Sequence, residues 1–337
     1  MGILNEKMII AEVGMTHDGS VGQAERMICE AAEAGVDAVK FQMHISEEET
    51  IKNAPTPPYF DAEPRYEYFN RTAFSFEQWK RIKEVCCRNK VAFIVSPFSI
   101  EAVKRLETLG VDAIKIPSGE VTNIPFIEYI AQAKIPTIIS SGMSSWDELK
   151  TCVDVFNRNE CEYAILQCTS EYPCPPEKVG LNIIEQLKLD YPNVPIGLSD
   201  HSQGIWASVA AWLKGATIIE KHFTLSKKMY GPDAKMSMEP EEMRELCNSI
   251  EQLQKAIDNP VDKDHIDEFE NMKKIFQKSI VAITDIPKGS VIEESMLGYK
   301  KPGVGLAPRY YKEIIGKKVL RDLHFDDIIY RGDVEWN

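Results

Sequence analysis

Several short apolar runs in the first two-thirds of the chain carry charged or hydroxyl side chains at their ends. Lysine occurs in three of them, as Lys40, Lys115 and Lys221. An ammonium group is costly to bury in an apolar segment unless an anion pairs with it. Each lysine alone could belong to a structural ion pair. Because all three lie within such runs, we expect them to converge, which indicates an anionic ligand such as a phosphate or a carboxylate; nearby serines would add hydroxyl donors.

Two histidines follow consecutive apolar runs, His201 after IGLSD and His222 within IIEKHF. Imidazoles that end neighbouring strands would lie side by side. Such a pair can bind a divalent transition metal whose other positions are taken by water or substrate. Histidines in such places can also be ordinary hydrogen-bonded core or rim residues. We interpret their joint placement as a metal site.

The runs that hold these residues alternate with amphipathic stretches. Ser20 and Gly35 suit the two ends of the first amphipathic helix. Apolar strands separated by helices predict a parallel sheet, and eight strand–helix units predict an α/β fold of the (β/α)8 TIM-barrel type. An open doubly wound sheet is the alternative, but its G-x-G-x-x-G turn is absent. The predicted strands are Met8–Gly14, Ala38–Gln42, Ala92–Pro97, Ala113–Ser118, Thr137–Gly142, Tyr163–Thr169, Ile196–Asp200 and Ile218–Thr224.

The active site of a TIM barrel lies at the carboxyl ends of its strands, so the polar residues there become candidates. The segment His44–Ala73, which contains APTPPYF, is unusually long for a loop at this end. It could cover a substrate or have no function. Cys168, inside YAILQC, is expected to be a small buried apolar residue rather than a nucleophile.

The sequence predicts three parts. Residues 1–258 form the catalytic barrel, and the polar residues 259–277 form a linker. Residues 278–337 change to short strands and turns, which predicts a small β-rich domain. A domain of this size is only marginally stable alone, so we expect it to pack against a partner surface.

The overall composition narrows the class of protein. The chain has 337 residues, a formal net charge of −13 and eight cysteines without a CxxC pair. A strongly acidic chain repels nucleic acid and anionic membranes, so we expect neither as a partner. We predict a cytoplasmic protein with reduced thiols, because the sequence shows no export signal and no transmembrane segment.

The ordered motifs IAEVGMTHDGS, VKFQ, SPFS, IKIPSGE, SSGM, CTSEYP, GLSDHS and EKHFTL…GPD resemble the sialic acid (nonulosonate) synthase family. The tail GSVIEESMLGYKKPGVGLAP…IIGKKV resembles that family's C-terminal antifreeze-like, or SAF, domain. The resemblance covers nearly the whole chain. A single motif such as SSGM is unspecific, whereas the ordered set at barrel-compatible spacing, together with this tail, is specific.

The resemblance implies a C–C bond-forming transferase. Such enzymes condense phosphoenolpyruvate (PEP) with an N-acetylated hexosamine, here N-acetylmannosamine or a 2,4-diacetamido-trideoxyhexose. The products would be N-acetylneuraminate, or a legionaminic- or pseudaminic-type acid, and phosphate. In this mechanism C3 of PEP attacks the sugar aldehyde, water adds at C2 and phosphate leaves by C–O cleavage. The family uses a divalent metal, manganese above all, with magnesium or cobalt as alternatives.

Site residues can be carried over from the family by motif. The PEP carboxylate and phosphate would be held by Lys40, Lys115, Ser118, Ser140 and Ser199. The site would be lined by Gln42, Ser96, Phe98 and Tyr172. His201 and His222 would ligate the metal, and Glu12 and Asp233 would contact the sugar hydroxyls, the metal or its water. The catalytic residues would be Glu12, Lys115, Glu120 and His222, with Glu120 transferring a proton and orienting the sugar.

The chain departs from the family pattern at several positions. THDG, with Thr16 and Asp18, replaces the usual NHNG, and KKMY precedes GPD. Lys301 replaces the arginine that, in the family's domain-swapped homodimer, reaches the partner subunit's site near the N-acetyl group. Lysine keeps the charge but loses the forked donor geometry, so the identity of the amino sugar is left open.

The sequence argues against two other functions. A PEP-using barrel synthase of seven- or eight-carbon keto acids would lack the SAF tail. A carbohydrate- or ice-binding protein would have no use for a lysine cluster in its barrel.

Overall fold

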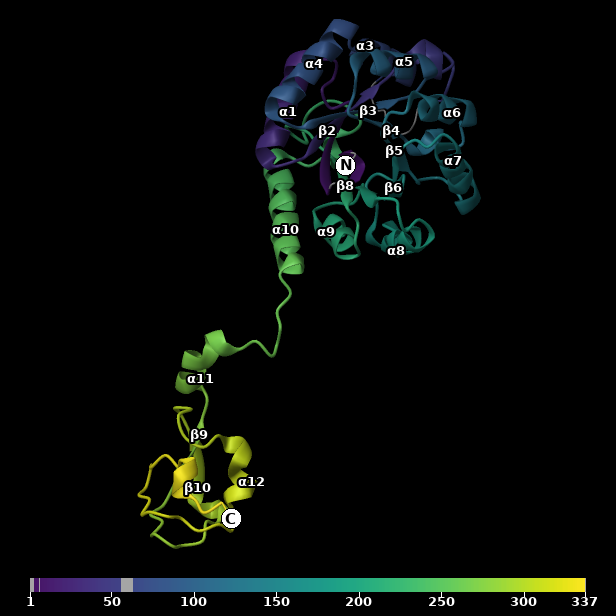
Figure 1. The fold of residues 1–337 in the computed structure, drawn as a ribbon. Helices are drawn as coiled ribbons and strands as arrows, with labels where there is room; N and C mark the ends of the chain where they lie inside the picture. Colours follow the sequence, from purple (N-terminus) through teal and green to yellow (C-terminus); the bar gives the residue numbers. More distant parts are fainter. Residues whose placement is uncertain (1–2, 6, 56–62, 337) are drawn as a thin grey trace. The chain divides into compact units, whose positions relative to one another are not determined.

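The computed structural model describes residues 3–5, 7–55 and 63–336 (Figure 1). The stretch APTPPYF lies mostly outside the described residues. The chain divides into two compact units, residues 1–258 and residues 259–337. No helix of the described residues is long and apolar enough to cross a membrane.

The first unit is a closed parallel barrel in which each strand pairs with the next one in the sequence and β8 closes onto β1. The TIM-barrel prediction is thereby confirmed. Some strands end earlier than predicted; β4 stops at Ile116 because Pro117 has no backbone N–H to continue the ladder. The strands are β1 (Met8–Gly14), β2 (Ala38–Met43), β3 (Ala92–Pro97), β4 (Ala113–Ile116), β5 (Thr137–Ser140), β6 (Tyr163–Cys168), β7 (Ile196–Asp200) and β8 (Ile218–His222).

Helices connect the strands and cover the outside of the barrel. The Ser20 side chain caps the first helix by accepting a hydrogen bond from the Gln23 N–H, and Gly35 ends it in the left-handed conformation. Two extra helices, α2 (Ser46–Glu49) and α3 (Arg65–Thr72), lie in the long segment after β2. The others are α1 (Val21–Ala34), α4 (Phe76–Asn89), α5 (Ile100–Leu109), α6 (Ile124–Ala133), α7 (Trp146–Arg158), α8 (Leu181–Asp190), α9 (Trp206–Leu213) and α10 (Pro240–Asp258).

The interior of the barrel is built in two layers. The lower layer is apolar and closes the barrel beneath the cavity; its strand residues are Met8, Ile10, Ala38, Ile94, Ala113, Ile138, Ala164, Leu166 and Ile218. Because side chains on one face of a strand recur every second residue, the layer above comes two positions later. It consists of Glu12, Lys40, Ser96, Lys115, Ser140, Cys168, Ser199 and Glu220. Every strand therefore supplies one residue to this upper layer, which lies directly above the apolar one.

The second unit has its own apolar core, which includes Ile280, Ile292, Leu306, Val319 and Ile329. Its sheet pairs β9 (Ser279–Ala282) and β10 (Leu297–Lys300) in antiparallel fashion, with α12 (Tyr311–Ile314) beside them. Within the predicted linker the chain forms a helix, α11 (Glu270–Phe276). This segment was predicted as a linker because it is polar. It forms a helix because it is rich in good helix formers such as Glu, Met and Lys.

Candidate active site

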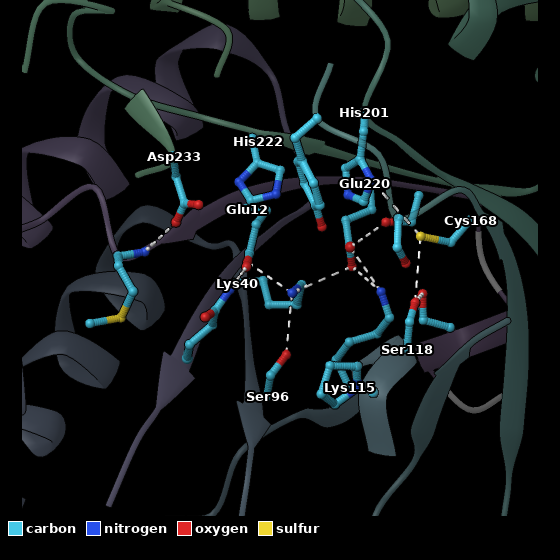
Figure 2. A pocket seen from close by; sticks show the side chains of 18 of the residues that line it. Glu12, Lys40, Ser96, Lys115, Ser118, Cys168, His201, Glu220, His222 and Asp233 are labelled. Carbon is cyan, nitrogen blue, oxygen red and sulfur yellow. Dashed lines mark hydrogen bonds and ion pairs between the residues drawn. The ribbon is translucent and has the colours of Figure 1, made fainter. Parts of the chain in front are cut away.

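The carboxyl ends of the strands surround a cavity of about 480 Å³ (Figure 2). It contains most of the residues predicted from the sequence. The chain brings them together although they span more than 200 positions, because the barrel collects one end of every strand. The predicted residues that line it are Glu12, Lys40, Gln42, Ser96, Phe98, Lys115, Ser118, Ser140, Tyr172, Ser199, His201, His222 and Asp233.

A buried ion network occupies the floor of the cavity. Lys40 Nζ lies 2.9 Å from Glu12 Oε2 and 3.7 Å from Glu220 Oε2, and Lys115 Nζ donates to both Glu220 oxygens at 2.8 Å. Ser199 Oγ donates to Glu220 Oε1 at 2.8 Å. Burial opposes ionisation of Glu220, but the two ammonium groups and the Ser199 hydroxyl lower its pKa to about 2. The lysines that suggested an anionic ligand are thus already paired with carboxylates.

Lys221 does not join this network, and the prediction that three lysines converge is wrong. Its ammonium lies 2.8 Å from Asp200 Oδ2 and donates to the Ser202 carbonyl at 2.5 Å. Glu220 and His222 point into the cavity from the same strand, so the residue between them must point outward. Lys221 is a structural ion-pair residue between the barrel and its helices.

Small hydroxyl groups crowd one side of the cavity beside Gly142. Ser118 Oγ donates to Ser140 Oγ at 3.1 Å, and a Cβ on Gly142 would lie 2.4 Å from Ser118 Oγ and 2.6 Å from Ser170 Oγ. The glycine therefore leaves room for three hydroxyls in one recess. This hydroxyl recess, with the Lys115 ammonium on the floor below it, has the donors that a phosphate or carboxylate requires.

Cys168 is buried, as expected, and it also lines the cavity beside this recess. Its sulfur lies 3.6 Å from Ser118 Oγ and 4.0 Å from His201 Nδ1. Burial raises the pKa of the thiol, but His201, Ser118 and the Lys115 charge outweigh burial and lower it to about 6. The position was predictable, because Cys168 follows Leu166 by two residues on the inner face of β6.

His201 and His222 lie side by side at the cavity wall, with ring centroids 5.5 Å apart. His201 Nδ1 lies 2.8 Å from the Thr169 carbonyl, so it donates there and Nε2 of the neutral ring is left as the ligating atom. His222 Nδ1 is buried without a hydrogen-bond partner. These two available nitrogens fit a divalent metal, although the described residues contain no group of three His, Cys, Asp or Glu side chains placed to hold one.

The pKa values of the two histidines differ in direction. Burial, reinforced by the His201 and Lys40 charges, lowers the pKa of His222 against the opposing pull of Asp233 and Glu12. Burial also acts to lower the pKa of His201, but Cys168 and the Thr169 carbonyl raise it overall. The lowered pKa of His222 favours the neutral form that a metal requires.

Asp233 reaches the cavity from the loop after β8. Its Oδ2 accepts a hydrogen bond from the Met15 N–H at 3.2 Å, and a Cβ on Gly14 would come within 2.8 Å of the same oxygen. Gly14 has φ +53°, at an irregularity in the pairing of β1 with β2. The glycine allows the backbone to approach the carboxylate and so brings Asp233 near Glu12.

A strap of four partly exposed residues fastens this loop, and two of them are departures from the family motifs. Arg71 on α3 lies 2.8 Å from Asp18 and 2.6 Å from Glu63. Tyr230, the last residue of KKMY, donates to Glu63 at 3.3 Å. Asp18 and Tyr230 thus belong to one assembly, which ties the loops after β1 and β8 to α3.

Two predicted residues do not line the cavity. Glu120 is partly buried just beyond Gly119, and Asn123 donates to its carboxylate at 2.8 Å. Burial raises the pKa of Glu120, aided by the Glu49 charge and opposed by Asn123 and Arg65. Lys301 lies on the second unit, with its ammonium 5.1 Å from the Phe276 ring centre.

Sequence reasoning missed several lining residues. Glu220 was given no role, although its place two residues before His222 assigns it to the inner face of the strand. His44, Arg65 and Phe69 come from the long segment after β2, whose irregular course gives no periodic signal. The remainder are Met15, Pro117, Gly119, Met143, Ser170, Pro232 and Met236.

Two family models match the chain: the NeuB family over residues 27–262 and the SAF domain over residues 277–335. The chain belongs to the NeuB family. It is 36% identical over 97% of its length to N,N'-diacetyllegionaminic acid synthase of Campylobacter jejuni, covering 99% of that protein. It is 34% identical over 97% of its length to N-acetylneuraminate-9-phosphate synthase of Mus musculus, covering 92% of that protein.

A solved structure agrees with these similarities. The N-acetylneuraminic acid (sialic acid) synthetase of Leptospira borgpetersenii, in complex with citrate, superposes with a TM-score of 0.71 at 32% identity. The match covers 80% of this chain and 92% of that one. Together these relatives support a role for the chain as a nonulosonic acid synthase.

Proposed function

We propose that the enzyme condenses PEP with an N-acetylated hexosamine, releasing phosphate and a nonulosonic acid. The observation that carries the proposal is the division of one cavity into two chemical halves. The hydroxyl recess and Lys115 form one half. The carboxylates Glu12 and Asp233, with His201 and His222 beside them, form the other. PEP fits the first half and a polyhydroxy aldehyde fits the second.

At the PEP half, the proposed roles follow from the donors present. The recess hydroxyls would bind the phosphate or carboxylate oxygens, and Lys40 and Lys115 would supply positive charge beneath them. Glu12 and Glu220 already pair with these lysines, so bound PEP would interact with ammonium groups that also contact carboxylates. In the empty site the same carboxylates keep the two buried ammonium groups paired.

At the sugar half, carboxylates would accept hydrogen bonds from sugar hydroxyls while Tyr172 packs over His201, with ring centroids 4.1 Å apart. Glu120, whose pKa is raised by burial, is proposed to move a proton near the aldehyde. Six apolar residues also line the cavity, and they suit a sugar with methyl-bearing substituents. They are Met15, Phe69, Phe98, Met143, Pro232 and Met236, and the cationic Arg65 lines the cavity with them.

A divalent metal, manganese by preference, is proposed at His201 and His222. When bound, it would polarise the aldehyde as a Lewis acid. We also propose a cytoplasmic location, which agrees with the eight cysteines, all of them free thiols.

The decisive experiment measures phosphate release with PEP, manganese and a panel of sugars, with chelator as control. The panel contains N-acetylmannosamine, its 6-phosphate and the 2,4-diacetamido-trideoxyhexoses. Release with at least one of these sugars is expected. Absence of release with every sugar, in folded protein with metal, would refute the function. Erythrose 4-phosphate and arabinose 5-phosphate test for the seven- and eight-carbon synthases.

Adjacent serines offer a matched pair for the PEP half. Ser140 lines the cavity, whereas Ser141 Oγ contacts Gln167 at 3.3 Å. Ser140→Ala should raise KM for PEP about tenfold, the effect of one lost hydrogen bond to a charged group, and Ser141→Ala should leave it unchanged. An equal change in KM for PEP in the two variants would show that Ser140 does not bind PEP.

A domain-swapped homodimer is proposed for Lys301, which would complete the site of the partner barrel. Lys301→Ala and Lys115→Met proteins should each be inactive alone. Mixed and re-associated, they should regain about a quarter of wild-type activity, because half of the dimers would hold one intact site of two. No recovery from exchanged dimers would place Lys301 outside the partner's site.

A further inference from the structure

His44 lies directly beyond β2 and has no role in the function proposed above. Its ring is sandwiched between Phe69, at 3.6 Å between ring centroids and 4° between planes, and Phe98, at 4.1 Å and 21°. The side chain is 3% exposed. Both ring nitrogens nevertheless have polar partners, so the stack fixes the ring plane while hydrogen bonds fix its rotation.

The partners form a chain that leads into the active site. His44 Nδ1 lies 2.8 Å from Glu49 Oε1, and His44 Nε2 lies 3.1 Å from Gln42 Oε1. Gln42 Nε2 in turn donates to Glu12 Oε1 at 2.7 Å. Glu12 is therefore held from two sides, by the Gln42 amide and by the Lys40 ammonium.

The hydrogen-bond directions along this chain are determined by chemistry. An ionised carboxylate only accepts, so Gln42 must turn its NH₂ group to Glu12 and its carbonyl oxygen to His44. The carbonyl also only accepts, so His44 must donate from Nε2. Glu49 likewise requires a donor at Nδ1. A ring that donates from both nitrogens is an imidazolium.

Reversing the Gln42 amide does not remove this requirement. It would set the carbonyl oxygen against Glu12 Oε1 at 2.7 Å, two acceptors in contact. Protonating Glu12 could relieve that contact, but the Lys40 ammonium at 2.9 Å stabilises the ionised carboxylate.

Other charged groups lie on the elements around His44. Glu49 belongs to α2, and Arg65 on α3 lies over the Phe69 ring at 5.4 Å. Glu120, beyond β4, interacts with both Glu49 and Arg65. His17, in the loop after β1, is held neutral by burial and by the His44 charge, which lower its pKa to about 3.

We propose that His44 is a positioning residue held as an imidazolium, and that its proton sets the orientation of the Gln42 amide and thereby the hydrogen bonding of Glu12. Loss of the Nε2 proton would place a lone pair against the Gln42 carbonyl. The amide would then turn over and present oxygen to Glu12. The link to catalysis rests on the proposed function, through the role of Glu12 at the sugar half.

The charge state can be measured without any activity. Histidine labelled with ¹⁵N in the full-length, metal-free protein reports which ring nitrogens carry protons, and the His44→Gln variant identifies the His44 signals among the six histidines. At neutral pH both His44 nitrogens should be protonated. A neutral tautomer, with one bare nitrogen, would overturn the proposal, and this result stands whatever the enzyme's substrate is.

Two substitutions separate the two hydrogen bonds. His44→Gln places an amide donor near the former Nε2 and keeps the bond to Gln42, whereas His44→Asn places one near Nδ1 and keeps the bond to Glu49. Both lose the stacked ring, so their Tm values should fall alike. The proposal expects His44→Asn to lower kcat/KM for the sugar about tenfold below His44→Gln, with KM for PEP unchanged in both.

A loss in kcat/KM for the sugar that is equal in the two variants would overturn the positioning role.

Discussion

Glu220 accepts hydrogen bonds from Lys115 through both oxygens and lies 3.7 Å from Lys40, all within the buried floor of the cavity. Glu220→Gln preserves the shape of the side chain but leaves two ammonium groups with one carboxylate, that of Glu12. Removing one partner of a buried ion pair costs about 3–5 kcal/mol. At about 2 °C per kcal/mol for a domain of this size, Tm should fall by roughly 6–10 °C.

Thermal unfolding followed by tryptophan fluorescence measures this loss. Glu171→Gln is the control: its ion pair with Lys178 has a similar distance, 2.7 Å, but both side chains are about half exposed. A surface pair of this kind contributes about 0–1 kcal/mol. Inorganic phosphate should stabilise the Glu220→Gln protein more than the wild type, since one ammonium is left without a counter-charge. A Tm equal to that of the wild type would refute the reasoning.

The same difference should depend on pH. The folded-state pKa of Glu220 is about 2, below the value of about 4.3 for an unfolded glutamate. Its contribution is therefore complete above the unfolded pKa and is lost as pH falls through the folded one. The gap in stability between wild type and Glu220→Gln should narrow from about pH 5 to pH 2. A gap that widened in acid would contradict this assignment.

Three further predictions follow from the site. Gly142→Ala places a methyl group against Ser118 Oγ, so KM for PEP should rise about tenfold with little change in Tm. An unchanged KM would show that the hydroxyl recess does not bind PEP. His222→Ala should weaken manganese binding at least tenfold in calorimetric titration, and undiminished affinity would relocate the metal. Lys221→Met should lower stability by about 3–5 kcal/mol because Asp200 loses its partner, while KM for PEP stays within about twofold of wild type. A large rise in that KM would make Lys221 a PEP ligand after all.

The sequence predicts the barrel well because its signals are local. Apolar strands, serine caps such as Ser20 and the glycine at position 35 each specify structure within a few residues. The residues that face the inside of the barrel could also have been predicted. Side chains alternate along β8, so Glu220 and His222 face the cavity and Lys221 faces outward. The prediction for Lys221 was wrong because it ignored this alternation.

The segment after β2 was not predictable in the same way. His44 gains its partners from Glu49 on a four-residue helix and from Phe69 on another short helix. Neither helix presents a long apolar period, and their positions are set by packing onto the barrel mouth. The protonation of His44 depends on a further step, the direction of the Gln42 amide, which only a three-dimensional hydrogen-bond network fixes.

The strap of Asp18, Glu63, Arg71 and Tyr230 joins segments that lie far apart in the sequence. The TIM-barrel fold supports many chemistries by variation of the loops at this end of the barrel. Here the loop that carries Asp233 is fastened by side chains from two other segments. Transferring this loop alone to another barrel would separate Tyr230 from Glu63. The three segments should therefore be transferred, or compared between relatives, together.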